Sequence, residues 1–389
     1  MSRVKPATAV KGRVAFKKSR PVVQNLLVVF QFTIAIVFIV CTLVIANQLN
    51  FLLSEDKGFN PSNKIVIALQ TETSKNSVEV LKREFLGIPG VEMAGASSEI
   101  PGSGYTSNGY FPEGHSEPLM FHALDIDYDY LETMELEIVQ GRNFSKDFGQ
   151  DKEAYIINEA LARQLGWDNP IGKTIQRDGK HPVIGVVNDY NFSPLHSHIE
   201  PLIITIKPWQ GYSYITLKTT QPIANIKNSV EEKWEALIPS EDFSFFTLDS
   251  FISEAYNPVK EFMYMILFCS FLAIFIASLG LFGLAAFLTR KRNKEIAVRK
   301  VFGAGINRIF ILVSSGFLKW VLLANGIAWP IAWFIMDNYF LANFAYNGGI
   351  KWWTFLAALL FTVFLSLFVI VFQIIRLGRL NPIDYIRYE

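Results

Sequence analysis

The basic segment at residues 290–308, which we expect to form a loop, holds the densest set of side chains that could act on a partner. Seven Arg and Lys residues stand there against a single acid. Cations can meet acidic groups on another protein, and small residues let a second backbone approach closely. We therefore expect a protein contact here, although the cations would also suffice to orient the chain in a membrane. The candidate contact residues are Glu295, Arg299, Lys300, Gly303 and Ala304.

Nucleotide-binding and catalytic patterns do not account for the chain. It has no G-x-x-x-x-G-K-[ST] phosphate loop, and the nearest cluster, residues 58–64, lacks the second glycine and the Ser or Thr. His181, Asp189 and Ser193 could be imagined as a hydrolase triad, but no G-x-S-x-G pattern surrounds Ser193. We therefore expect a non-catalytic chain that binds no cofactor and obtains work from a partner.

Histidine and cysteine spacing gives little support for a metal or a disulfide. His196 and His198 would lie on one face of a strand, and no third zinc ligand is obvious. Two loop histidines are the favoured interpretation. Cys41 and Cys269 both fall in apolar stretches, where small buried side chains are expected.

Four apolar stretches predict a membrane protein. Charged residues make up 18% of the chain, against about 25% in soluble proteins. A helix needs about 20 residues to cross a bilayer, and helix is the state that satisfies its own backbone there. The net charge of +1 offers no general attraction for nucleic acid. The predicted spans are residues 24–53, about 262–289, about 319–340 and about 352–375.

The distribution of charge predicts the orientation of these spans. Residues 1–23 hold seven cations and no acid, and residues 290–308 hold seven more. Basic flanks stay on the cytoplasmic side of a membrane. Residues 54–258 contain 30 acids and 16 cations, which is a net charge of −14. We expect both termini in the cytoplasm and residues 54–258 outside.

Lys319 is a charge beside the third apolar stretch. One interpretation starts the span near Lys319, with its amine at the inner interface and residues 306–317 forming an amphipathic surface segment. The alternative is a buried polar role within the membrane. Both remain open from the sequence, and we keep Lys319 as an interfacial candidate.

The region outside the membrane has the pattern of an α+β domain interrupted by an insertion. Strand, helix and strand patterns occur near its start and again near its end. The middle is rich in strands, and Asn158 and Gly166 are placed as the cap and the stop of one helix. The flanking patterns cover residues 64–70, 77–86 and 90–96, then 214–218, 223–237 and 243–248.

A series of short motifs resembles the MacB/FtsX-like permease family of ABC transporters. The first are D-Y-L-E-T-M at residues 129–134, G-R-N-F at 141–144, I-N-E-A-L-A at 157–162 and P-I-G-K at 170–173. V-I-G-V-V-N-D-Y at 183–190 and P-L-H at 194–196 continue the series. R-K-R-N-K-E-I-A-V-R-K-V-F-G-A at 290–304 and N-P-I-D-Y-I-R-Y at 381–388 resemble the family's cytoplasmic signature and its usual end.

The resemblance implies four transmembrane helices, a MacB-like periplasmic core domain at 54–258 and an FtsX-like permease domain at 259–389. It also implies a bacterial inner membrane, a separate cytoplasmic ATPase and a dimeric transporter made with a second permease half or a second copy. A periplasmic cargo or adaptor is a further expected partner. The ATPase would dock on the basic segment. The alternative function is a membrane-anchored sensor or regulatory scaffold acting on a partner such as a cell-wall enzyme.

An echo between the two ends of the chain suggests duplication. K-P-A-T-A-V-K at 5–11 and N-P-I-D-Y-I-R at 381–387 both fit x-P-x-x-x-[VI]-[KR]. We expect the chain to be, or to descend from, one half of an eight-helix permease.

Overall fold

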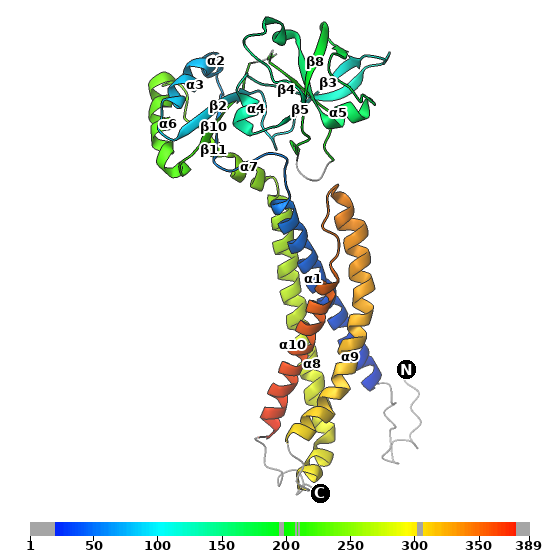
Figure 1. The fold of residues 1–389 in the computed structure, drawn as a ribbon. Helices are drawn as coiled ribbons and strands as arrows, with labels where there is room; N and C mark the ends of the chain where they lie inside the picture. Colours follow the sequence, from blue (N-terminus) through cyan, green and yellow to red (C-terminus); the bar gives the residue numbers. More distant parts are fainter. Residues whose placement is uncertain (1–19, 194–197, 207, 209–210, 302–305, 379–389) are drawn as a thin grey trace, which may run out of the picture. The chain divides into compact units, whose positions relative to one another are not determined.

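The computed structural model describes residues 20–193, 198–206, 208, 211–301 and 306–378, and it describes side chains for all of these except 20–22, 288–301, 306–313 and 374–378. The chain forms two compact units, which Figure 1 draws as a helical part and a mixed part. The membrane unit takes the residues up to Gln48, Val259–Ala342 and those from Gly348 onward. The α+β domain takes Leu49–Pro258 together with Asn343–Asn347.

Long apolar helices form the membrane unit, in agreement with the predicted fold class. They are α1 (Arg20–Ser54), α8 (Asn257–Val301), α9 (Ile306–Ile335) and α10 (Trp352–Gly378). Within the described residues, each carries a stretch long and apolar enough to cross a membrane. Phe268 and Phe271 on α8 are 63% and 65% exposed, as suits side chains that face hydrocarbon.

The basic segment differs from the loop expected at residues 290–308. Helix α8 continues through it to Val301, and α9 begins at Ile306. Arg, Lys, Glu and Ala are good helix formers, and the first glycine of the segment is Gly303. The helical pattern of the second span therefore has no reason to stop at residue 289.

Helix α9 also runs without a break past Lys319, where a separate surface segment was expected to end. After Ile335 it widens into a π-helical turn, η3 (Met336–Phe340), and then tightens into a 3₁₀ turn, η4 (Leu341–Asn343). Among the residues whose side chains are described, its candidate span covers Ser314–Asn343 and includes Lys319.

A four-stranded antiparallel sheet unites the two ends of the α+β domain. Its order is β11-β1-β10-β2, from β1 (Lys64–Ala68), β2 (Val91–Ser97), β10 (Tyr214–Thr219) and β11 (Phe245–Thr247). Short α2 (Glu72–Asn76) precedes α3 (Val78–Leu86), which packs with α6 (Ile223–Leu237) on one face around buried Trp234 and Phe85. This is a split β-α-β arrangement with an insertion between β2 and β10, as the sequence pattern predicted.

The insertion closes a second sheet into a barrel. The order is β5-β8-β6-β9-β4-β3-β7, and β7 also pairs with β8. The strands are β3 (Thr106–Pro112), β4 (Leu119–Asp125), β5 (Ile138–Gly141), β6 (Tyr155–Asn158), β7 (Thr174–Gln176), β8 (Lys180–Val187) and β9 (Leu202–Thr205). Short η2 (Gly149–Glu153) precedes β6, and α5 (Glu159–Gln164) follows it. Alternating side chains such as Tyr110, Phe121 and Ile203 fill the interior.

The two sheets are joined by backbone hydrogen bonds. Ser97 and Ile126 form an antiparallel bridge, and Ser98 donates to the carbonyl oxygen of Asp125 at 2.8 Å. The chain then enters α4 (Tyr130–Met134), which packs against β2 and β10 on the face opposite α3 and α6. Helix α7 (Leu248–Glu254) follows β11, and Ala255 and Tyr256 separate it from α8.

Candidate coupling sites in the membrane unit and the α+β domain

The end of α8 carries three of the five sequence-predicted contact residues. Glu295, Arg299 and Lys300 lie in its last two turns, before Val301. Glu295 and Arg299 are four residues apart and therefore share one helix face. Gly303 and Ala304 lie outside the described residues, as do the side chains of the other three. The backbone thus presents the cations on a helix end rather than on a loop.

Lys319 is exposed on α9, five residues inside the candidate span that begins at Ser314. Its four-carbon stem allows the amine to reach the membrane surface from this position. The described helices do not enclose the Lys319 side chain, and its interfacial role stays a prediction.

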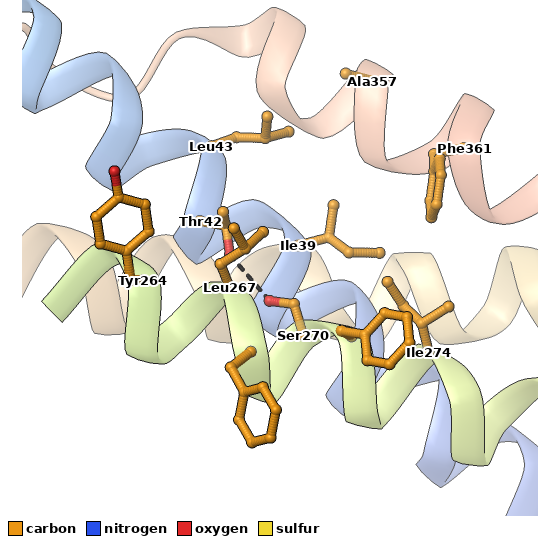
Figure 2. A pocket seen from close by; sticks show the side chains of 11 residues that line it. Ile39, Thr42, Leu43, Tyr264, Leu267, Ser270, Ile274, Ala357 and Phe361 are labelled. Atoms are coloured by element: carbon orange, nitrogen blue, oxygen red, sulfur yellow. Dashed lines mark hydrogen bonds between the residues drawn. The ribbon is translucent and has the colours of Figure 1, made fainter. Parts of the chain in front are cut away.

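An apolar groove of about 810 Å³ opens between α1, α8 and α10 (Figure 2). Among its lining residues, the Thr42 and Ser270 hydroxyls lie 2.9 Å apart, and Figure 2 shows the hydrogen bond between them as a dashed line. The Thr42 hydroxyl can also donate to the Phe38 carbonyl oxygen, and the Ser270 hydroxyl can donate to the Ile266 carbonyl oxygen. Among the described residues, no basic side chain lines the groove to activate either hydroxyl, and the lining suits contact with hydrocarbon.

Polar side chains fix the registers of the membrane helices. Asn325 on α9 donates to the Val321 carbonyl oxygen at 2.9 Å and to Thr362 on α10 at 3.3 Å. Gln31 of α1 fits against Gly280 of α8, where an added Cβ would lie 2.1 Å from its amide oxygen. Such hydrogen bonds and close approaches position helices in a lipid environment, where apolar contact alone is poorly specific.

Two buried lysines hold α4 and the chain before it on the first sheet of the α+β domain. Lys82 of α3 pairs with Asp127, both almost fully buried, and with Asp129 at 2.7 Å. Lys64 of β1 is fully buried and donates to Glu135 at 3.0 Å, and Glu135 also meets Lys218 at 3.1 Å.

These surroundings move the pKa values of the paired groups in different directions. Burial raises the pKa of the Asp127 carboxyl, and the Lys82 ammonium offsets that rise in part. Burial also acts to raise the pKa of Glu135, but its hydrogen bonds with Lys64 and Lys218 outweigh burial and lower it. The two ion pairs therefore link α4 and the chain before it to β1 and α3.

His181 and Asp189, two of the three possible triad residues, form hydrogen bonds with different groups. The His181 ring contacts the Glu153 carbonyl oxygen at 3.0 Å and Asp178 at 2.8 Å. Asp189 accepts from the Ala160 amide at 2.8 Å and pairs with Arg163. Because the hydrogen bonds of His181 and Asp189 go to other groups, they do not form a catalytic pair.

The structure does not place further metal ligands around the two histidines considered for zinc, as far as the described residues extend. His196 lies outside the described residues, and the His198 ring packs edge-on against Tyr346, with ring centroids 5.6 Å apart. Within the part of the chain that the structure describes, no group of three or more His, Cys, Asp or Glu side chains could hold a metal ion.

Sequence reasoning considered Asp189 and Ser193 only as possible triad members, and it missed the contacts made by the segment Asp189–Ser193, which we call the junction segment. It follows β8, and its Tyr190 and Phe192 are each 1% exposed. Asn191 donates its backbone N–H to the Lys57 carbonyl oxygen at 2.8 Å, so the segment touches the chain that leaves α1. The available signal was the alternation of aromatic and polar residues directly after a buried strand.

Comparisons with known proteins agree with this architecture. A family model described as MacB-like periplasmic core domain matches residues 26–233, and one described as FtsX-like permease C-terminal matches residues 267–382. A comparison with curated proteins gave no match.

Two solved structures illustrate the similarity. The periplasmic region of MacB from Actinobacillus actinomycetemcomitans is 16% identical, with 53% of this chain and 98% of that chain covered and a TM-score of 0.39. The extracellular domain of the noncanonic ABC-type transporter YknZ from Gram-positive bacteria is 19% identical, with 47% and 98% covered and a TM-score of 0.34. The two family models follow the order of the α+β domain and the last three helices, and the chain belongs to the MacB/FtsX-like permease family of ABC transporters.

Proposed function

We propose that this membrane subunit couples ATP hydrolysis by a separate cytoplasmic ATPase to movement of the α+β domain. That movement exports or extracts a peptide, drug, lipid or lipoprotein. In this proposal the chain lies in a bacterial inner membrane, with both termini cytoplasmic and the α+β domain in the periplasm. A second permease half or a second copy completes the transporter, and a cargo or adaptor meets the α+β domain.

The continuity of α8 is the observation that carries the proposal. This single helix of 45 residues begins at the α+β domain and ends in the basic segment. At about 1.5 Å per residue it is about 67 Å long, more than twice the roughly 30 Å hydrocarbon core of a bilayer. An unbroken helix transmits displacement along its axis, because its backbone hydrogen bonds resist bending and stretching.

In this proposal the ATPase binds at the basic end of α8. Arg299 and Lys300 can meet acidic groups on the ATPase, and Gly303 and Ala304 leave room for its backbone. We expect the replacement Gly303→Trp to abolish permease-stimulated ATP hydrolysis in proteoliposomes that contain the cognate ATPase. Asn293→Trp, in the same basic segment, is the matched control and should keep stimulation.

Co-purification separates this function from a scaffold. A detergent-solubilised chain that retains an ATPase supports the transporter, whereas one that retains a cell-wall enzyme without an ATPase supports the scaffold. Full stimulation and full ATPase binding by Gly303→Trp would contradict the coupling role of the basic segment.

A further inference from the structure

Three connections link the membrane unit covalently to the α+β domain. The first is the chain that leaves α1 after Gln48, and the second is the chain that enters α8 at Pro258. The third is Asn343–Asn347, which packs with the α+β domain although the residues on either side belong to the membrane unit. The place where each connection meets the domain can be read from contacts within the domain itself.

The first connection meets the junction segment backbone to backbone. Besides the hydrogen bond from Asn191 to Lys57, Gly58 packs so closely that an added Cβ would lie 2.6 Å from the Asp189 carbonyl oxygen. Gly58 has a φ of +76°, which favours glycine. Phe59 then meets the Tyr190 ring edge-on at 6.1 Å.

The second connection meets the same segment from α7. Asn191 and Ser193 line a small cavity, about 10 Å³, together with Ile252, Ala255 and Tyr256. Tyr256 is 2% exposed, so the chain just before α8 is buried in the domain. The chain that enters α8 and the junction segment therefore line the same small cavity, which places them next to each other.

The third connection reaches the residues beside the segment through an aromatic contact. Tyr346 meets the His198 ring at 5.6 Å with an interplanar angle of 69°, and the neighbouring Phe344 is 7% exposed. Arg163, which pairs with Asp189, has its pKa raised mainly by that carboxylate, with a smaller contribution from Tyr346. Tyr346 therefore contacts the His198 ring, and its smaller effect on Arg163 agrees with that position.

We propose that the junction segment Asp189–Ser193, with Arg163 and His198 beside it, receives all three connections, and that Tyr346 is the positioning residue that docks the α9–α10 loop there. The inference rests on the coupling function proposed above, and it names where helix motion enters the α+β domain. Helices α9 and α10 then act on the domain through Tyr346, and not only α1 and α8 through the continuous chain.

A crosslinking experiment tests the docking without any transport activity. In full-length chain with Cys41→Ala and Cys269→Ala, the pair His198→Cys and Tyr346→Cys is treated in membranes with a short bis-thiosulfonate reagent, and the joined peptides are identified by mass spectrometry. The control pair is His115→Cys with Tyr346→Cys, because His115 lies on an exposed loop of the same domain. We expect crosslinking in the first pair alone, and equal yields in both pairs would overturn the docking.

A second measurement tests the coupling. In proteoliposomes with the ATPase bound, Tyr346→Ala should lower permease-stimulated hydrolysis by about fivefold or more. Tyr346→Phe keeps the ring contact and should restore stimulation, and Tyr339→Ala, which changes an exposed tyrosine of the membrane unit, should leave it unchanged. Full stimulation by Tyr346→Ala would overturn the coupling role of the loop. If the wild-type chain stimulates no ATPase, the proposed function fails and the coupling role with it, while crosslinking still decides the docking.

Discussion

Lys82 shows how much a single buried ion pair contributes to the α+β domain. Its ammonium group meets Asp127, which is itself buried, so Lys82→Ala would leave an unpaired carboxylate in the interior. Breaking a buried pair in this way costs about 3–5 kcal/mol of the free energy of unfolding. We expect a clear fall in the urea midpoint of the detergent-solubilised chain, followed by its total tryptophan fluorescence, to which buried Trp234 contributes.

The control for this prediction is Lys233→Ala. Lys233 forms an exposed pair with Glu84 at 2.7 Å, and exposed pairs are strongly screened by solvent. A loss of stability as large for Lys233→Ala as for Lys82→Ala would show that burial is not what makes the Lys82 pair important.

Asp151 makes the folding stability of the α+β domain depend on pH in the acid range. The Arg142 guanidinium holds it with two hydrogen bonds of 2.6 Å, the Ser145 amide donates a third at 2.9 Å, and the Arg142 bonds lower the pKa of the carboxyl below its ordinary 3.8. A lowered folded-state pKa means that the stabilisation is complete above the unfolded value and is lost as the pH falls through the folded value.

The corresponding prediction compares urea unfolding at about pH 7 and about pH 3. The Asp151→Asn variant should be less stable than the wild-type chain at the higher pH and should lose less stability on acidification. Asp147→Asn, on the same loop but exposed, should keep the wild-type pH dependence. An unchanged pH dependence in Asp151→Asn would assign the acid sensitivity to other carboxylates.

At the level of elements, a glycine in β2 sets how closely α4 approaches the sheet. A Cβ added at Gly95 would lie 2.6 Å from the Tyr130 Cα, which is backbone and cannot move aside cheaply. Gly95→Ala should therefore push α4 away and cost about 1–3 kcal/mol by overpacking. The measurement is again the urea midpoint.

Gly109→Ala is the matched control in another strand. Its nearest neighbour would be 3.8 Å from the added Cβ, an ordinary contact, so little change is expected. If both alanines lowered the midpoint equally, the loss would reflect a general intolerance of strands to the substitution rather than the contact with α4.

The elements that could be predicted from the sequence are those with a local signal. Helix α6 was predicted over residues 223–237 because its apolar residues recur at helical spacing. The Asn158 cap was predicted because Asn is a preferred N-cap residue, and in the structure its side chain accepts from the Leu161 amide. The extension of α8 to Val301 was missed because a run of charges was read as a loop, although Arg, Lys and Glu favour helix.

The contacts of the candidate sites could not be predicted in the same way. The Lys82–Asp127 pair joins residues 45 apart in the sequence, and Tyr346 meets a histidine 148 residues earlier. Such contacts depend on how the sheets and loops pack, and neither the spacing nor the composition of the sequence predicts that packing. For the basic segment the sequence is the only guide. Its residues were found from composition, and their side chains lie outside the described part of the chain.

For the whole molecule, α8 connects charge distribution to topology. Its candidate span, Asn257–Phe287, covers 31 of its 45 residues, and the basic residues from 290 to 301 lie in the part of the helix beyond that span. Basic residues are retained on the cytoplasmic side, so the α+β domain at the other end of this helix should face outward.

Thiol labelling of intact spheroplasts tests this arrangement. In a background with Cys41→Ala and Cys269→Ala, Ser116→Cys on an exposed loop of the α+β domain should react with an impermeant maleimide before lysis. Asn293→Cys, in the basic segment, should react only after lysis, because the membrane shields it. Labelling of Asn293→Cys in intact cells would reverse the orientation and remove the basic segment from the reach of a cytoplasmic ATPase.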